Sequence, residues 1–227
     1  MSYIISIEGT DCSGKGTQSQ ILADKINQRG KAVLLSFPDY TSPTGKIIGG
    51  AYLGKAHIGQ PLFSEGATNV DAKVASLLYA ADRRYNVDKI LKPLENGYNV
   101  ILNRYVESNM GHQASKCKTA EERDEMLSFL ETLEYDLLKL PRPDLTIFLY
   151  MPYEQSLILK SGREEKPDQH ELDGEYLKKS EETYLHIAEK FGYEKIDCYE
   201  NGRILTREEI SSKIWQVVTE KFPDINE

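Results

Sequence analysis

The residues best suited to chemistry form one run near the start of the chain. The run is Gly9-Thr10-Asp11-Cys12-Ser13-Gly14-Lys15-Gly16-Thr17, which carries the glycines and the lysine of the Gly-x-x-x-x-Gly-Lys phosphate loop. Glycines let successive backbone N–H groups point at phosphate oxygens, and the lysine of such a loop reaches the β- and γ-phosphates. The run follows a strand-like segment and precedes a helical one, as the motif requires. We therefore expect residues 9–17 to bind ATP; a glycine-rich turn that binds nothing is the alternative.

The ligands of the magnesium ion that accompanies ATP are less clearly marked. The usual loop has Ser or Thr directly after the lysine to ligate magnesium, and Gly16 stands there instead. A second ligand is normally a carboxylate at the end of a buried strand, but the best candidate strand ends in Asn103. The carboxylates that remain are Glu8 and Asp11, with Asp168 or Glu171 if a later loop closes over the site. We assign the metal contact to Asp11.

Two further groups are candidates for nucleotide binding. Arg104 follows directly after a strand, so we expect it at the sheet edge beside the phosphate loop, where it could clamp a phosphate. The alternative is an ordinary surface arginine. Tyr79 and Arg83 lie four residues apart on one helix face. They could stack on a base and hydrogen-bond its carbonyl, although core packing with a surface charge is the alternative.

A polar segment at residues 160–170 predicts a mobile lid. It contains glycine and proline between two helical segments, together with Arg163, Lys166 and Asp168. A plain solvated loop is the alternative. The histidines show no metal-ligand spacing, and no Ser-His-Asp or Cys-His set of nucleophile and base is recognisable.

Strand-like and helical segments alternate along the chain. Apolar or β-rich runs predict strands at 3–8, 32–37, 99–102, 145–151 and 195–199. Helical periodicity predicts helices at 16–29, 70–94, 120–140, 154–159, 174–191 and 207–221. Thr206 and Glu209 have the spacing of a capping box for the last helix, and Asn201-Gly202 predicts a tight turn. This alternation is typical of a mainly parallel sheet with helices on both faces, and we expect one α/β domain over residues 1–227.

Composition narrows the class of protein. The 227 residues are 40% hydrophobic and 28% charged, which is typical of a globular chain. A net charge of −8 without a basic block argues against binding to duplex nucleic acid. The 3 cysteines are too few for a disulfide framework and lack the spacing of a zinc site, and they suit a reducing compartment. No apolar run is long enough to cross a membrane, and no signal peptide is recognisable, so we expect a cytoplasmic protein.

Several segments, taken in order, resemble a single family over most of the chain. They are residues 8–17, Phe37-Pro38-Asp39-Tyr40 with Pro43-Thr44-Gly45, Leu78-Tyr79-Ala80-Ala81-Asp82-Arg83, Asn103-Arg104-Tyr105 with Ser108, His112 and Gln113, Pro143-Asp144-Leu145-Thr146, and Asp168-Gln169-His170-Glu171. Their order and spacing resemble the thymidylate kinase family of P-loop nucleoside monophosphate kinases. Asn103 stands in place of the acid of the family's Asp-Arg-Tyr motif, and Tyr40 in place of an arginine that often assists the acceptor phosphate.

The resemblance implies a fold, a reaction and a set of roles. The fold is a P-loop NTPase-type three-layer sandwich with a five-stranded parallel sheet and a short lid at about 160–171. The reaction transfers the γ-phosphoryl group of ATP to dTMP, depends on Mg²⁺ and is usually performed by homodimers. Catalysis is assigned by the resemblance to Asp11, Lys15, Arg104 and Arg163, with Arg163 as a charge-stabilising finger from the lid. Substrate binding is assigned to Phe37, Tyr79, Arg83, Arg104, His112, Gln113, Asp168 and Glu171.

Two other functions remain possible from the sequence alone. One is a kinase for another nucleoside monophosphate, because the departures at Asn103 and Tyr40 lie on the acceptor side. The other is a P-loop protein that holds a nucleotide without productive transfer. The pair of Tyr79 and Arg83 favours an acceptor site, and therefore a kinase.

Overall fold

A computed structural model describes residues 1–160 and 173–226 of the chain. Its centre is a 5-stranded sheet in the order β2-β3-β1-β4-β5, in which every neighbouring pair is parallel. The strands are β1 (Ile4–Gly9), β2 (Ala32–Ser36), β3 (Asn99–Asn103), β4 (Leu145–Tyr150) and β5 (Glu194–Asp197). The predicted fold class is confirmed.

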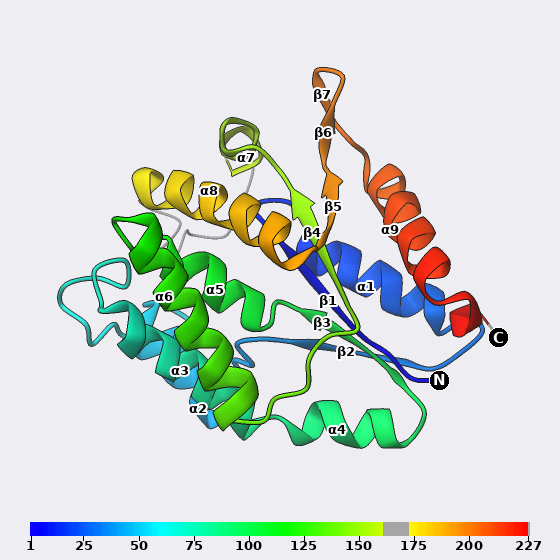
Figure 1. Ribbon diagram of the computed structural model, residues 1–227, viewed down its shortest axis with the longest axis horizontal. Helices are drawn as coiled ribbons and strands as arrows, with labels where there is room; N and C mark the ends of the chain where they lie inside the picture. The colour runs from blue at the N-terminus through cyan, green and yellow to red at the C-terminus, as the bar shows by residue number, and fades with distance from the viewer. Residues whose placement is uncertain (161–172, 227) are drawn as a thin grey trace.

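Helices cover both faces of this sheet because side chains alternate along each strand. Ile5 and Ile7 of β1 point to one face, where they pack with α1 (Lys15–Ile26) and α9 (Arg207–Lys221). Ile4 of β1 points to the other face, which is covered by α4 (Asp88–Glu95), α5 (Val106–Ala114), α6 (Ala120–Glu131) and α8 (Gly174–Phe191). Figure 1 shows the two helical layers on opposite sides of the sheet.

A third apolar cluster holds the segment after β2 against α3 (Ala72–Tyr85). The segment contains a short α2 (Pro43–Lys46) that continues as the π-helical η1 (Ile47–Tyr52). Ile48 and Tyr52 of η1 are fully buried and pack with Ala75 of α3. The cluster fixes the position of α3 relative to the end of β2.

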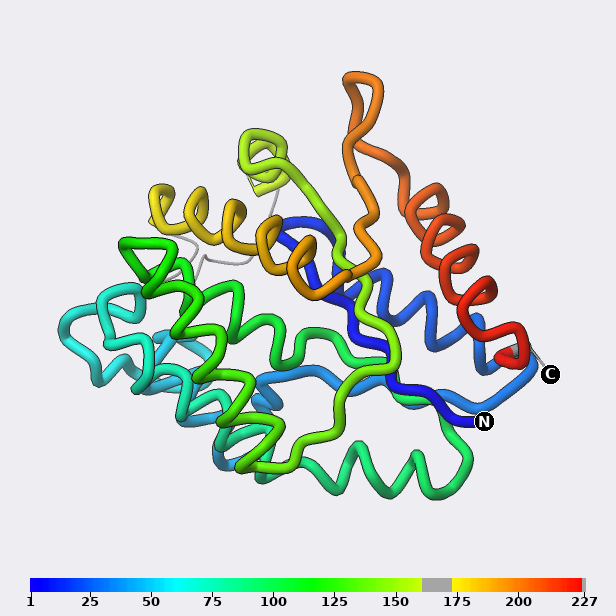
Figure 2. Tube along the Cα trace, viewed as in Figure 1, coloured from blue at the N-terminus to red at the C-terminus, as the bar shows by residue number. Residues whose placement is uncertain are grey.

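The C-terminal part of the chain returns to the N-terminus. After α7 (Tyr153–Lys160) and α8, the chain forms β5, a hairpin of β6 (Tyr199–Glu200) and β7 (Arg203–Ile204), α9 and a short η3 (Pro223–Asn226). Tyr3 donates a hydrogen bond to Asp224 at 2.7 Å, and the two ends of the tube lie side by side in Figure 2. The predicted turn at Asn201-Gly202 and the capping box of Thr206 and Glu209 are confirmed.

Two predicted helices are wrong in detail. The expected helix at 70–94 is two helices, α3 and α4, separated at residues 86–87. At the break, both the N–H and the side-chain amide of Asn86 donate to the Asp82 carbonyl, at 3.1 Å and 2.9 Å, so Asn86 caps the end of α3. The expected helix at 120–140 becomes π-helical in η2 (Thr132–Leu137), which turns Glu134 into the core. The sequence analysis also missed α5, which begins at Val106 without a side-chain cap.

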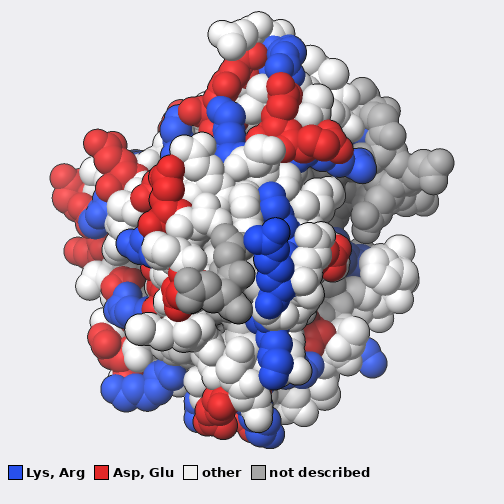
Figure 3. Space-filling model, turned by 90° about the vertical axis from the view of Figure 1, so that its right-hand side faces the viewer, with Lys and Arg blue, Asp and Glu red and all other residues white. Residues whose placement is uncertain are grey.

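The surface is mixed in charge. On the face turned toward the viewer in Figure 3, Lys and Arg form a narrow row bordered by acidic and uncharged side chains. Within the part of the chain that the structure describes, no helix is long and apolar enough to cross a membrane.

Candidate active site

The phosphate loop has the backbone conformation that its glycines predict. Gly14 takes a left-handed φ of 82° directly before α1, so the N-terminal N–H groups of the helix face the loop. A Cβ on Gly9 would lie 2.4 Å from the carbonyl oxygen of Leu149, so only glycine fits there. Thr10 fastens the loop to the chain after β4, because its Oγ1 donates to the Met151 carbonyl at 2.7 Å. The strand, loop and helix are arranged as a phosphate site requires.

Lys15 lies at the first position of α1 with its ammonium group folded into the loop. Its Nζ donates to the backbone carbonyls of Gly9 at 3.0 Å and Thr10 at 2.7 Å. Burial lowers the pKa of Lys15 to about 7, and the nearby charge of Arg104 adds to this effect. An anionic phosphate beside the ammonium group would favour its charged form.

Asp11 links the phosphate loop to the end of α7. Its carboxylate forms an ion pair with Lys160 at 2.6 Å. Burial acts to raise the pKa of Asp11, but the charges of Lys15, Lys160 and Arg104 together hold it below its usual value. The carboxylate is therefore ionised at neutral pH and already shared with a lysine that the sequence analysis gave no role.

Arg104 lies where it was predicted, at the carboxyl end of β3 beside the loop. It adopts a left-handed φ of 66°, which is uncommon for a residue with a side chain. Glu8 explains this backbone turn: its carboxylate accepts from the Tyr105 N–H at 2.7 Å and from the Ser108 hydroxyl at 2.8 Å. Glu8 thus organises the start of α5, and both of its oxygens are engaged by Ser108.

A cavity of about 290 Å³ joins the phosphate loop to the predicted acceptor residues. Of the predicted site residues, it is lined by Gly9, Thr10, Asp11, Phe37, Tyr79, Arg83, Arg104, His112 and Gln113. The remaining loop residues, Cys12, Ser13, Gly14, Lys15, Gly16 and Thr17, continue along the loop into α1 without lining this cavity. Arg163, Asp168 and Glu171 lie outside the described residues.

Arg83 is a buried member of the cavity wall, so the surface-charge alternative is wrong. It is 1% exposed and forms a bidentate ion pair with Glu134, donating from Nε at 2.8 Å. Its Nη1 donates to the Tyr105 carbonyl at 3.2 Å. Burial opposes the charge, yet Glu134 raises the pKa of Arg83 above its ordinary value. Glu134 was missed because an acid in a helical segment is ordinarily solvated.

One amide side chain, Gln113, and one imidazole, His112, both from α5, complete this end of the cavity. Gln113 is fully buried, and neither atom of its amide has a hydrogen-bond partner among the described residues. His112 Nδ1 lies 3.0 Å from the hydroxyl of Tyr176 on α8. Gln113 therefore offers a donor and an acceptor to a ligand in the cavity, whereas His112 is held against α8.

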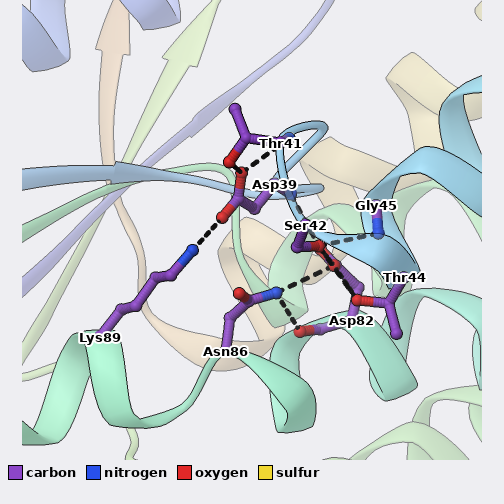
Figure 4. A network of polar contacts seen from close by, with 8 residues as sticks. All are labelled: Asp39, Thr41, Ser42, Thr44, Gly45, Asp82, Asn86 and Lys89. Atoms are coloured by element: carbon purple, nitrogen blue, oxygen red, sulfur yellow. Dashed lines mark hydrogen bonds and ion pairs between the residues drawn. The ribbon is translucent and has the colours of Figure 1, made fainter. Parts of the chain in front are cut away.

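A polar network around Asp82 fixes the loop that carries Phe37 (Figure 4). Asp82 of α3 accepts from the Asp39 N–H at 2.9 Å, the Ser42 hydroxyl at 2.9 Å and the Thr44 hydroxyl at 2.6 Å. The side chain of Asp39 forms an ion pair with Lys89. The helix that carries Tyr79 therefore also determines where Phe37 lies. The sequence analysis quoted Asp82 only as part of a motif.

The oxygen ligands suitable for magnesium are one carboxylate, of Asp11, and one neutral amide, of Asn103. Asn103 Nδ2 donates to the Ser36 hydroxyl at 3.1 Å, which directs the amide oxygen away from Ser36. A Cβ on Gly16 would lie 3.6 Å from that Nδ2, so both unusual positions of the motifs face each other. No group of three or more His, Cys, Asp or Glu side chains that could hold a metal occurs within residues 1–160 and 173–226. Magnesium commonly binds through one or two protein oxygens together with substrate phosphates. Asp11 and Asn103 can supply the protein oxygens.

Comparisons with known proteins agree on one family. The family model described as thymidylate kinase matches residues 7–210. A probable thymidylate kinase of Thermococcus onnurineus (strain NA1) is 33% identical over 190 residues, covering 82% of this chain and 84% of the relative. A thymidylate kinase of Sulfurihydrogenibium is 33% identical over 191 residues, covering 83% and 84%. A solved thymidylate kinase from Candida albicans aligns with a TM-score of 0.72 at 26% identity, covering 100% of this chain and 94% of that one.

Proposed function

This chain belongs to the thymidylate kinase family, and we propose that it transfers the γ-phosphoryl group of ATP to dTMP, giving dTDP and ADP. The resemblance that the motifs carry is thereby confirmed. The observation that supports this reaction most directly is the shared cavity, which brings Asp11 of the phosphate loop together with Arg104, Tyr79 and Gln113.

The donor phosphates bind to the phosphate loop. The backbone N–H groups of residues 9–17 and the N-terminus of α1 hold the β- and γ-phosphates of ATP. Lys15 neutralises the charge that moves to the leaving ADP oxygen when the bond from γ-phosphorus breaks. Its two contacts to loop carbonyls hold the ammonium group ready beside the loop.

The acceptor monophosphate binds on the opposite side of the cavity. Arg104 holds its phosphate group, and a phosphate oxygen attacks the γ-phosphorus of ATP in line with the leaving oxygen. Phe37 and Tyr79 flank the base. Arg83 uses N–H groups not taken by Glu134 and Tyr105 to contact a base carbonyl, because a guanidinium has five N–H donors. Gln113 offers both amide atoms to the nucleoside.

The lid contributes Arg163, Asp168 and Glu171, which lie outside the described residues. We assign Arg163 as the arginine that stabilises the transferred phosphoryl group, since the loop of residues 9–17 contains no arginine. Asp168 and Glu171 contact the acceptor. If Arg163 acts on the transition state, Arg163→Ala will lower kcat far more than it changes the KM for ATP. Loss of ATP affinity alone would contradict this role.

We assign Mg²⁺ as the second cofactor beside ATP. Asp11 and Asn103 supply oxygen ligands, directly or through water. Bound magnesium would neutralise charge on the phosphate oxygens. Because Asp11 is paired with Lys160, the carboxylate can coordinate magnesium only as far as this ion pair loosens.

An assay with a panel of nucleoside monophosphates, each with ATP and magnesium, tests the reaction. We expect dTMP to give the highest kcat/KM. The Candida albicans neighbour is described by its broad substrate specificity, so the panel includes the other pyrimidine monophosphates. Preference for another monophosphate would favour the rival kinase, and ATP binding without transfer to any acceptor would favour a non-catalytic P-loop protein.

We further propose a cytoplasmic homodimer formed through α3. Val74, Leu77, Ala81 and Tyr85 are exposed at helical spacing and form one apolar face. A second copy of the chain can present the same face across a two-fold axis. Light scattering on Leu77→Glu, compared with the unmodified chain, tests this assembly. The cytoplasm fits the 3 free cysteines, because disulfides are rare there.

A further inference from the structure

The hydroxyl group of Tyr184 is buried in the cavity wall without a good protein partner. Tyr184 lies on α8, is 2% exposed and lines the cavity. Its hydroxyl makes no hydrogen bond of good geometry with the described residues. Leaving a buried hydroxyl unpaired costs free energy, and phenylalanine would avoid this cost. A buried hydroxyl that lacks a good partner and faces a cavity suggests that a ligand in the cavity completes its hydrogen bond.

Packing on several sides fixes the direction of the Tyr184 ring. The ring stacks on Phe148 with centroids 5.7 Å apart and an interplanar angle of 8°. His112 meets it edge-on, with centroids 5.7 Å apart. A Cβ on Gly111 would lie 2.4 Å from Cζ of the ring, so α5 approaches the phenol closely only because position 111 is glycine. The hydroxyl is therefore held at one place.

That place is next to Arg104 and Ser108. The Ser108 hydroxyl lies beside the phenol and makes only a weak hydrogen bond with it, because the single Ser108 proton is directed at the Glu8 carboxylate, with Oγ 2.8 Å from each carboxylate oxygen. The Arg104 guanidinium also approaches Ser108, with Nη1 3.5 Å from Oγ. Burial and then Glu8 raise the pKa of Tyr184, so the phenol stays protonated and remains a donor. A cation and a neutral donor thus face the same part of the cavity.

We infer that the Tyr184 hydroxyl donates a hydrogen bond to a non-bridging oxygen of the acceptor's 5′-phosphate, beside Arg104. The inference rests on the proposed function, which places a nucleoside monophosphate in this cavity. The base end is defined by Tyr79, Arg83 and Gln113, whereas Ser108 lies in the first turns of α5, near the phosphate loop. A phosphate dianion there accepts charge-assisted hydrogen bonds, which are stronger than neutral ones.

The test compares dTMP with thymidine, which lacks the phosphate, as calorimetric ligands for Tyr184→Phe and the unmodified enzyme. We expect Tyr184→Phe to bind dTMP about tenfold more weakly, as expected for a lost hydrogen bond to a charged group. Thymidine affinity and the KM for ATP will stay unchanged. Tyr193→Phe is the matched control, because its hydroxyl lies in the same core, near Met110 Sδ at 3.9 Å, and does not line the cavity.

Two results would overturn the inference. Equal dTMP affinity in Tyr184→Phe and the unmodified enzyme would show that the hydroxyl does not touch the ligand. Equal weakening of dTMP and thymidine would show that it contacts the nucleoside or supports the fold. If the panel assay reveals a different acceptor, the proposed function fails by itself, and the same comparison with that monophosphate and its nucleoside decides the role of Tyr184.

Discussion

The two sides of the cavity are built in different ways. The phosphate loop is one continuous run, residues 9–17, and its conformation follows from glycines and backbone contacts. The acceptor side is assembled from β2, α3, β3, α5 and α8, and depends on the buried pair of Arg83 and Glu134 and on the Asp82 network. Mutations in the loop should therefore affect chemistry with little effect on folding, whereas mutations on the acceptor side should affect both.

Lys15→Ala gives the largest expected effect and tests the loop side of this comparison. We expect kcat/KM to fall more than a hundredfold, because removing a preorganised charge from the transition state costs about this much. Far-UV circular dichroism will stay unchanged. Lys25→Ala is the matched control, since Lys25 lies on the same helix and packs on Trp215 with Nζ 4.4 Å from the ring. A Lys15→Ala enzyme that keeps more than about a tenth of the rate would contradict the assignment.

Arg83→Ala tests the acceptor side, where function and folding are coupled. Removing this arginine leaves the buried Glu134 without a cationic partner, although Asn109 still donates to its Oε1 at 2.9 Å. We therefore expect the free energy of unfolding to fall by about 3–5 kcal/mol. We also expect dTMP use to weaken more than tenfold, as for a site that loses a buried donor to its substrate. Urea unfolding and steady-state kinetics measure the two effects.

A double variant separates these two effects. Replacing both partners, in Arg83→Met with Glu134→Leu, removes the unpaired charge and should restore most of the lost stability. The affinity for dTMP should stay low, because the donor to the base is still missing. Recovery of both stability and dTMP affinity would mean that Arg83 has a structural role only.

The same contrast explains what could be predicted from sequence. The strands, the loop, the position of Arg104 and the capping box at Thr206 follow from local patterns of apolar, glycine and cap residues. Glu134 could not be predicted as an internal partner, because it becomes buried only through the π-helical turns of η2. The role of Asp82 depends on three donors from a loop about forty positions earlier. Such contacts have no local signal.

Glu107, buried between α5 and the sheet, predicts a pH dependence of stability. It lies in the first turn of α5, and its carboxylate accepts from Ser6 at 3.2 Å and Thr146 at 3.3 Å. Burial, with the nearby charge of Glu8, raises its pKa from 4.5 to about 7. Between these values the folded state binds more protons than the unfolded state, so stability falls as pH rises. The full loss is about 3 kcal/mol.

Glu107→Gln should remove this dependence, because the amide keeps an acceptor for Ser6 and Thr146 without titrating. Urea unfolding at pH 5 and pH 8 measures the change for both forms. We expect the variant to be more stable than the unmodified chain at pH 8, with little difference at pH 5. Glu189→Gln, at an exposed position of α8, is the control. An unchanged slope in Glu107→Gln would assign the dependence to another group.

Asn103→Asp gives the smallest expected effect and tests the place where the phosphate loop and the acceptor side of the cavity meet. Asn103 ends β3, donates to Ser36 and faces Gly16 of the loop. A carboxylate there adds a full negative charge for magnesium or its waters, and charge-assisted contacts are roughly twice as strong as neutral ones. We expect the magnesium concentration for half-maximal rate to fall by roughly threefold to tenfold. Binding of Mn²⁺ in the presence of ATP, followed by electron paramagnetic resonance, gives a readout independent of turnover.

The opposite result would also be informative, because the added carboxylate lies near the acceptor phosphate as well as the metal. Asp11 and Glu8 already place negative charge around Arg104, and both hold its pKa above the ordinary value. A further carboxylate could draw Arg104 away from the acceptor. Slower transfer at every magnesium concentration, with tighter Mn²⁺ binding, would mean that Asn103 limits negative charge around the acceptor. In that case the neutral side chain of Asn103 favours binding of the acceptor, and the enzyme binds magnesium more weakly as a result.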